Sequence, residues 1–344
     1  MKAWIKHVSA GQGGASSCVS KIQRQYKQTY LFQGSVVTTT AFITHSDCFL
    51  HDMGSYHPES PTRLHAINDH LIAQGIDGYF SNYDAPLATL EQLARVHPAS
   101  HLDRLKRSSP EHGIVHLDPD TAMNPHTWRA AQRSAGAGVL AVDLLMKGEV
   151  ENAFCAVRPP GHHAERNNAM GFCFINNVAV AARHAVVAHG LKRVAVIDFD
   201  VHHGNGTEDI FANDENVLMC SIFQHPFYPY SGSENPASNM VNVPLSAGSG
   251  GEELRGAVMD VWMPALRKFK PEMIFISAGF DAHYEDDMGS MKLFEKDYAW
   301  VTDQLVALAD EFSKKRIVSM LEGGYVLSSL ARSVTAHLRS LASL

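Results

Sequence analysis

The amino-acid sequence predicts one α/β domain, with a central parallel sheet and helices on both faces. From Ala41 onward, short β-rich runs alternate with longer segments of helical periodicity, which is the order expected when crossover helices join parallel strands. Several of the β-rich runs are apolar almost throughout, as in strands that are covered on both faces. No internal repeat and no Pro/Gly/Ser-rich linker divides these elements, so a single domain accounts for them.

The predicted strands and helices follow one another in regular order. The strands are Ala41–Thr44, Ala153–Val157, Arg193–Asp200, Val217–Phe223, Met273–Asp281 and Arg316–Glu322. The helices carry end signals such as an early proline or a following glycine. They run from about Ser60 to Gly75 and over Trp128–Met146, Val178–His189, Glu252–Phe269, Lys296–Ser313 and Leu327–Leu341. Pro264 is expected to kink or break the helix that contains it.

The composition excludes several classes of protein. The net charge of −7 argues against a nucleic-acid-binding protein, which usually carries a basic face. No apolar run approaches the ~18 residues that a membrane span requires, so no membrane association is predicted. The five cysteines are odd in number, widely spaced and without a CxxC pair. This pattern favours a reducing compartment, the cytoplasm, over a disulfide framework.

Residues 1–40 differ in composition from the rest of the chain. They contain five Lys or Arg and no Asp or Glu, whereas residues 41–344 contain 24 basic and 36 acidic residues, a net charge of −12. We interpret residues 1–40 as a basic leader without a catalytic role and residues 41–344 as the domain that carries the chemistry. An organellar targeting segment is the alternative interpretation of the leader.

Two predicted strands end in residues that can bind a metal ion. The strand that begins at Arg193 ends in Asp198 and Asp200, with His202 just beyond it, and the alternation of a strand points these side chains to one side. A second strand ends at Asp281. In parallel sheets the ligand site lies beyond the carboxyl ends of the strands. Two carboxylates and one imidazole would hold a zinc ion and leave a coordination position open for water.

Two further strand ends carry groups that can transfer a proton or stabilise negative charge. The sequence Pro159-Pro160-Gly161 forms a rigid turn before His162 and His163, and it can aim both rings at one place. Imidazoles suit general acid and base work because their pKa lies near working pH. Tyr325 follows two glycines at the last strand end, and its hydroxyl can donate to a developing oxyanion.

Together these motifs resemble the histone deacetylase family in their order and approximate spacing. The resemblance is closest to the class II and bacterial deacetylase-like amidohydrolases, and it covers the chain from about Phe42 to the C-terminus. It implies the arginase/deacetylase fold and the zinc-dependent hydrolysis of the amide bond of acetyl-lysine or a related acyl-lysine. The motifs that carry it are Arg158–Glu165, Gly171–Phe174, Asp198–Gly206, Ala278–Asp281 and Glu322–Tyr325.

The resemblance also implies a role for each catalytic residue. His163 would be the general base and acid, with His162 as its electrostatic partner, and Tyr325 would polarise the amide carbonyl. Asp198 would orient His162, and Asn205 would pair with His163. The zinc ligands would be Asp200, His202 and Asp281.

A second set of residues is implied around this centre. A potassium ion would bind near the zinc, at Asp198, Asp200, His202 and Ser221. The walls of a narrow tunnel for an aliphatic chain would come from Gly171, Phe172 and Tyr228. Arg63 would lie near an acetate exit cavity, and either Asp118 or Asp120 would bind the substrate backbone at the rim.

The identity of the substrate leaves alternatives open. An acetylpolyamine amidohydrolase would use the same fold and ligands, and a catalytically silent acyl-lysine binding module would have lost a ligand or the tyrosine, both of which this chain keeps. An arginase-like dimanganese hydrolase would need bridging ligands that the motifs lack. Polyamine-selective relatives place a glutamate at the position matched by Met288. Methionine there favours an acyl-lysine peptide or protein as the partner; a homo-oligomer stays open.

Overall fold

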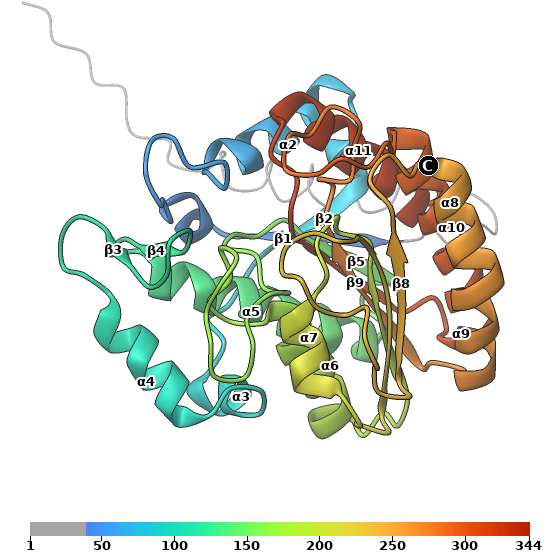
Figure 1. The fold of residues 1–344 in the computed structure, drawn as a ribbon, viewed down its shortest axis with the longest axis horizontal. Coiled ribbons are helices and arrows are strands. Elements are labelled where there is room, and N and C mark those ends of the chain that lie inside the picture. The colour runs from blue at the N-terminus through green and yellow to red at the C-terminus, as the bar shows by residue number, and fades with distance from the viewer. Residues whose placement is uncertain (1–38) are drawn as a thin grey trace, which may run out of the picture. The chain divides into compact units, whose positions relative to one another are not determined.

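The computed structural model describes residues 39–344, and its core is an eight-stranded sheet (Figure 1). The strand order is β2-β1-β5-β10-β9-β6-β7-β8, and all neighbouring strands run parallel. The predicted α/β class with a parallel sheet is confirmed. Except for Thr39 and Thr40, the predicted leader lies outside the described residues.

The strands of the sheet are short, and the central ones are buried throughout, as their apolar sequences predict. Their bounds are β1 Thr40–Thr44, β2 Phe80–Asp84, β5 Asn152–Cys155, β6 Val194–Asp198, β7 Val217–Gln224, β8 Met240–Leu245, β9 Met273–Ala278 and β10 Ile317–Leu321. Two further strands, β3 Val115–His116 and β4 Ala122–Met123, form a small antiparallel ribbon.

The sequence analysis missed the two edge strands of the sheet. Strand β2 has the polar sequence Phe-Ser-Asn-Tyr-Asp, and strand β8 contains Asn242 and Pro244. An edge strand has one neighbour only and is less covered, so it tolerates polar residues and proline. Strand β2 alternates between more and less covered positions, and β8 is buried only at Met240, which explains why neither shows the continuous apolar pattern of the central strands.

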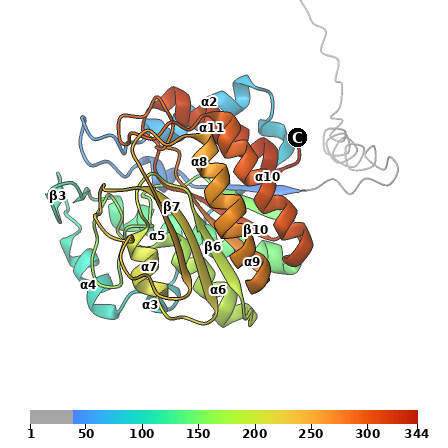
Figure 2. The ribbon, with the colours of Figure 1, turned by 45° about the vertical axis from the view of Figure 1, so that its right-hand side comes forward.

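Helices cover both faces of the sheet (Figures 1 and 2). Helices α5 and α6 pack together against one face, and α2, α10 and α11 pack together on the other. The longer helices are α2 Thr62–Ala73, α4 Ala99–Ser108, α5 Thr127–Lys147, α6 Asn177–His189, α10 Glu295–Phe312 and α11 Leu327–Leu341. The shorter helical elements are η1 Ser46–Phe49, η2 Asp77–Tyr79, α3 Leu90–Ala94, α7 Asn205–Phe211, α8 Gly251–Gly256, η3 Ala257–Trp262 and α9 Met263–Phe269.

Pro264 neither breaks its helix nor ends it. The chain passes from α8 through a π-helical segment, η3, directly into α9, and Pro264 lies in the first turn of α9. A proline lacks the amide that an α-helix would use, and a wider turn before it accommodates the ring. The expected disturbance at Pro264 is therefore present as a change of helix type.

The strand order brings the predicted motifs together. Strands β5, β10, β9, β6 and β7 are consecutive neighbours in the sheet. The motifs around His162, Tyr325, Asp281 and Asp200 follow four of these strands, and the fifth leads to Tyr228. Because the strands are parallel, all five motifs leave the sheet at the same edge.

Two expectations from composition concern the described residues alone. Cys48, Cys155, Cys173 and Cys220 are buried free thiols, as expected without a disulfide framework. None of the helices in residues 39–344 has the length and apolar character needed to cross a membrane.

Candidate active site

The end of β6 folds so that each polar side chain holds the backbone of the next. Strand β6 ends at Asp198, two residues before the predicted end. The Asp198 carboxylate accepts from the amide of Asp200 (3.1 Å), and the Asp200 carboxylate accepts from the amide of His202 (2.9 Å). These two turns, rather than strand alternation, place the three side chains around one point.

Asp200, His202 and Asp281 form a buried group that can hold a metal ion. His202 Nδ1 lies 3.1 Å from Asp200 Oδ1 and 3.2 Å from Asp281 Oδ2. Neighbouring ligand atoms around a tetrahedral zinc lie roughly 3.3 Å apart, given bond lengths of about 2.0–2.2 Å. The spacing of the three groups therefore matches the set of ligands predicted for zinc.

Two further observations indicate a cation at this point. Asp281 Oδ1 accepts from the amide of Val201 (2.9 Å), but the buried Oδ2 has no hydrogen-bond partner among the described residues. Two glycines also leave room for the carboxylates, because a Cβ at Gly279 would lie 2.0 Å from Asp200 Oδ2 and one at Gly323 would lie 2.1 Å from Asp281 Oδ2. A buried carboxylate oxygen without a hydrogen bond is costly unless a cation compensates it.

The electrostatics of the group agree with this interpretation. Burial, together with the neighbouring Asp200, raises the pKa of Asp281 to about 7. Burial alone would lower the pKa of His202, but Asp200 and Asp281 raise it to about 10. Without a metal ion, the imidazole is thus forced to carry the positive charge that the two carboxylates require.

A second group, Asp143, His184 and His189, also has ligand atoms close together, but its hydrogen bonds indicate a different role. Both histidines donate through Nε2 to Asp143 Oδ1, at 2.9 and 2.7 Å. His184 Nδ1 lies 3.1 Å from the Arg95 guanidinium, which can only donate. His184 therefore keeps its proton on Nε2, where a metal ion would have to bind. The group instead holds α5 and α6 together through its hydrogen bonds.

The tandem histidines are held in different environments. His162 donates through Nδ1 to Asp198 Oδ2 (3.0 Å). His163 donates through Nδ1 to the side-chain oxygen of Asn205 (2.8 Å), and the orientation of that amide is fixed because its NH₂ group donates to Glu165 (2.8 Å). In a neutral His163 ring, Nε2 is thereby the nitrogen that carries the lone pair.

The two rings, whose centroids lie 4.0 Å apart, have opposite electrostatics. Burial alone would lower the pKa of His162, but the carboxylates of Asp200 and Asp198 raise it well above its ordinary value. Burial, together with the charges of His162 and His202, lowers the pKa of His163 well below its ordinary value. His162 is thus the cationic ring and His163 the neutral one.

Glu322, to which the sequence analysis assigned no role, holds the tandem histidines in place. One carboxylate oxygen accepts from the amides of Gly161 (2.7 Å) and His162 (3.1 Å). Burial raises the pKa of Glu322 to about 7. Its place immediately before two glycines at a strand end was the signal that could have singled it out.

Tyr325 is held from two sides. Its backbone amide and that of Val326 donate to Asp286 Oδ2, at 2.7 and 3.1 Å. The Arg63 guanidinium lies 5.0 Å from the centre of the Tyr325 ring, and its Nε donates to the carbonyl of Gly324 (2.6 Å). Arg63 is thus buried directly beside the tyrosine, and its place near an acetate exit cavity stays a prediction.

A buried ion network ties Arg63 to the first half of the chain. The Glu59 carboxylate contacts the guanidinium groups of both Arg63 and Arg158. Arg158 also donates to the carbonyls of Cys48 and His51, each at 3.0 Å. Burial alone would raise the pKa of Glu59, but Arg158, His51 and Arg63 hold it well below its usual range. The sequence analysis had assigned no role to Glu59 or Arg158.

A cavity of about 240 Å³ opens onto these groups. Its lining combines catalytic candidates with aromatic walls: Asp120, His163, Gly171, Phe172, His202, Phe227, Tyr228, Asp287, Met288 and Tyr325. The predicted wall residues Gly171, Phe172 and Tyr228 are all present. Gly171 has φ +55°, and a Cβ there would lie 2.5 Å from the His163 ring and 3.0 Å from the Tyr228 hydroxyl, so only glycine fits.

Asp120, and not Asp118, lines this cavity. Asp118 Oδ1 accepts from the amides of Asp120 (3.0 Å) and Thr121 (2.6 Å). Its carboxylate is therefore used to shape the loop. Of the two residues predicted for the rim, Asp120 is thus the one that lines the cavity, and substrate binding by either stays a prediction.

Three consecutive acidic residues in the loop after Asp281, Glu285, Asp286 and Asp287, have different surroundings. Glu285 pairs with Arg332 on the surface (2.8 Å), and the buried Asp286 holds the backbone at Tyr325. Asp287 and Met288 line the cavity, with Asp287 exposed and Met288 partly buried. The sequence alone could not decide which of these carboxylates faces the mouth, because the answer depends on how the loop folds.

Ser221, predicted at a potassium site, is buried and lies opposite Asp198 in the register of β7 with β6. Its hydroxyl lies 3.4 Å from His203 Nδ1. The register brings together Asp198 and Ser221, two of the four residues predicted for that ion.

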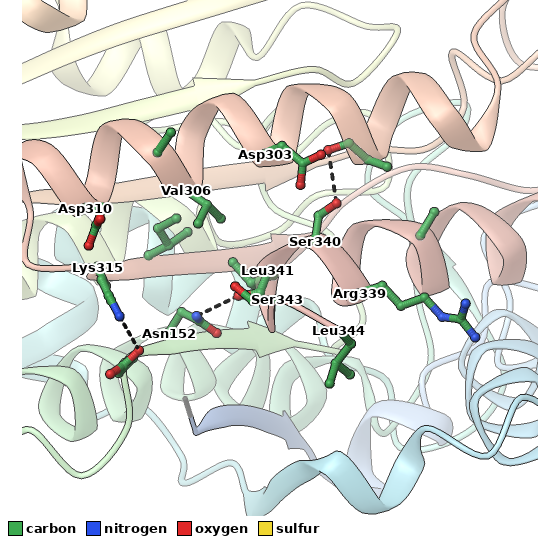
Figure 3. Close-up of a pocket in the computed structure, with 15 residues that line it drawn as sticks. Asn152, Asp303, Val306, Asp310, Lys315, Arg339, Ser340, Leu341, Ser343 and Leu344 are labelled. Atoms are coloured by element: carbon green, nitrogen blue, oxygen red, sulfur yellow. Dashed lines mark hydrogen bonds and ion pairs between the residues drawn. The ribbon is translucent and has the colours of Figure 1, made fainter. Parts of the chain in front are cut away.

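A larger cavity, of about 680 Å³, lies far from this chemistry (Figure 3). It is lined by Asn152 and Ile317, the first residues of β5 and β10, and by side chains of α10 and α11. It is therefore at the opposite edge of the sheet from the tandem histidines. The described residues that line it include no histidine or cysteine, and it offers no comparable centre.

Comparison with known proteins gives a consistent result. The histone deacetylase domain family matches residues 57–341. The histone deacetylase-like amidohydrolase of Pseudomonas aeruginosa is 38% identical over 78% of this chain and 72% of its own length. A probable deacetylase of Archaeoglobus fulgidus is 35% identical over 83% of this chain and 81% of its own. The crystal structure of the HDA15 HD domain superposes with a TM-score of 0.83 at 36% identity, covering 89% of this chain and 90% of that one.

The fold and the site thus define a hydrolase of the arginase/deacetylase fold. The chain belongs to the histone deacetylase family and is a deacetylase. The recognition of this family from its strand-end motifs is confirmed, as is the predicted fold.

Proposed function

We propose that this protein is a zinc-dependent deacylase that hydrolyses the amide bond of acetyl-lysine or a related acyl-lysine, releasing a carboxylate and the free lysine amine. The observation that carries the proposal is the convergence of Asp200, His202 and Asp281, with a carboxylate oxygen that has no hydrogen bond among the described residues, beside a cavity with aromatic walls that His202 lines. A catalytically silent binding module would not need this ligand set together with two histidines and Tyr325.

The three ligands would hold the zinc ion, and the other residues would act on the substrate around it. When bound, zinc supplies a Lewis acid that polarises the acyl carbonyl and acidifies a water molecule. His163, with its Nδ1–H committed to Asn205, accepts the proton of the attacking water through Nε2. The cationic His162 beside it, held by Asp198, offsets the negative charge that develops on the carbonyl oxygen.

The remaining steps also fall to this chain's side chains. The Tyr325 hydroxyl donates to the developing oxyanion, in a partly buried position beside the ligand group where such a donor is effective. The proton on His163 then passes to the leaving nitrogen, so that the lysine leaves as a free amine. Phe172 and Tyr228 enclose the methylene chain of the lysine. Asp120 would accept from the substrate backbone at the rim.

A potassium ion at Asp198, Asp200, His202 and Ser221 is the second part of the proposal. Asp198 accepts a hydrogen bond from His162 and lies beside Ser221 in the sheet. A monovalent cation there would offset part of the buried negative charge behind the zinc ligands.

The zinc assignment predicts that Asp281→Ala loses the bound metal and falls to background activity, because two ligands do not retain the ion. Metal content measured by elemental analysis, with circular dichroism to verify the fold, is the test. Asp143→Ala is the matched control: it removes a carboxylate from the other Asp/His group and should keep both metal and activity. Metal retained in Asp281→Ala, with activity intact, would refute the assignment.

The oxyanion assignment predicts that Tyr325→Phe lowers kcat by ~100–1000-fold, the usual effect of losing one oxyanion donor. The substitution removes one hydroxyl group and no packing volume, so the protein should fold normally. Tyr79→Phe, at an exposed tyrosine outside the cavity, should leave kcat unchanged. A Tyr325→Phe enzyme within a few-fold of wild type would show that the hydroxyl carries none of this charge.

The substrate assignment predicts that kcat/KM is higher for acyl-lysine peptides than for acetylspermidine or acetylputrescine. Met288 offers an apolar, adaptable surface beside the mouth, whereas a glutamate there would attract the distal amine of a polyamine. Met288→Glu should shift the selectivity toward polyamines by about two- to five-fold, and Met288→Gln, of similar size but uncharged, should not. Wild-type kcat/KM favouring an acetylpolyamine over every peptide tested would contradict the assignment.

A further inference from the structure

The outer rim of the cavity carries two carboxylates, and one of them, Asp287, has no part in the mechanism proposed above. Among the residues that line the cavity, Asp120 and Asp287 are both exposed, and no described lining residue is a lysine or arginine. The deeper lining is aromatic or apolar apart from the histidines and Tyr325. Charge therefore lies at the entrance and apolar surface lies inside.

Asp287 differs from its acidic neighbours in having no internal partner. Glu285 is paired with Arg332, and Asp286 is buried against the backbone of Tyr325 and Val326. The Asp287 carboxylate makes no hydrogen bond or ion pair with any described residue. A carboxylate that stabilises nothing in the protein, at the mouth of a substrate cavity, is free to meet a charge on the substrate.

We propose that Asp287, together with Asp120, selects acyl-lysine segments whose flanking residues are positively charged. This inference rests on the proposed function and names the substrate class: an acyl-lysine next to lysine or arginine. Because Asp287 is exposed and Met288 beside it is partly buried, the carboxylate faces the peptide flanks rather than the lysine side chain within the cavity. The net charge of −12 over residues 41–344 would attract the same substrates from a distance.

The test uses three acyl-lysine peptides that differ only in their flanking residues, which are Arg, Gln or Glu. The quantity compared is the ratio of kcat/KM for the Arg-flanked peptide to kcat/KM for the Glu-flanked peptide. For the wild-type enzyme this ratio should exceed one, mainly because KM is lower for the Arg-flanked peptide. Asp287→Asn should reduce this ratio by about two- to five-fold, the range for one exposed ion pair, and Asp287→Lys should reduce it further. Raising the ionic strength should reduce the wild-type ratio as well, since exposed charges are screened.

Glu285→Gln is the matched control, because it removes an equal charge two residues away that does not line the cavity. It should leave the ratio unchanged. A wild-type ratio near one, or a ratio that Asp287→Asn does not change, would overturn this inference. The proposed function would still stand in that case if the enzyme turns over the Gln-flanked peptide. Loss of turnover on all three peptides by the metal-loaded enzyme would overturn the proposed function and this inference with it.

Discussion

The structure depends on how it compensates buried negative charge at one edge of its sheet. Asp198, Asp200, Asp281 and Glu322 are fully or almost fully buried within a few residues of three adjacent strand ends, those of β6, β9 and β10. Isolated buried carboxylates are too costly to persist, so each must meet a hydrogen-bond donor or a cation. Asp198 meets His162, and Glu322 meets two backbone amides. Asp200 and Asp281 share the single imidazole of His202, and this remaining deficit of positive charge is what a divalent ion would fill.

The surrounding structure keeps these groups rigid. Glycines at 279 and 323 allow the carboxylates to approach, and Asp286 and Arg63 hold the segment that carries Tyr325. The Glu59 network links that segment to Arg158 after β5. Buried ion networks are a poor source of stability but fix geometry when every member is paired. Here the network connects residues far apart in sequence to the two strand ends that supply the tandem histidines and the tyrosine.

Much of this arrangement could be predicted from the sequence, and the parts that could not have physical reasons. Apolar runs predict the central strands. Polar residues at the ends of these strands predict that Asp200, His163 and Tyr325 belong to one site, because the carboxyl ends of parallel strands lie at the same edge of the sheet. Edge strands β2 and β8 lack that pattern because they are half covered. The choice between Asp118 and Asp120, and the separate roles of Glu285, Asp286 and Asp287, depend on hydrogen bonds and an ion pair in loops. Such contacts leave no periodic signal in the sequence.

The central claim is that the buried charge deficit at the sheet edge binds one catalytic zinc ion. Anomalous diffraction at the zinc absorption edge, from crystals of the zinc-loaded protein, tests it most directly. The account predicts one strong peak bounded by Asp200, His202 and Asp281, facing the cavity that contains His163 and Tyr325. A peak at Asp143, His184 and His189 with none at the sheet edge, or no ordered zinc at all, would contradict it.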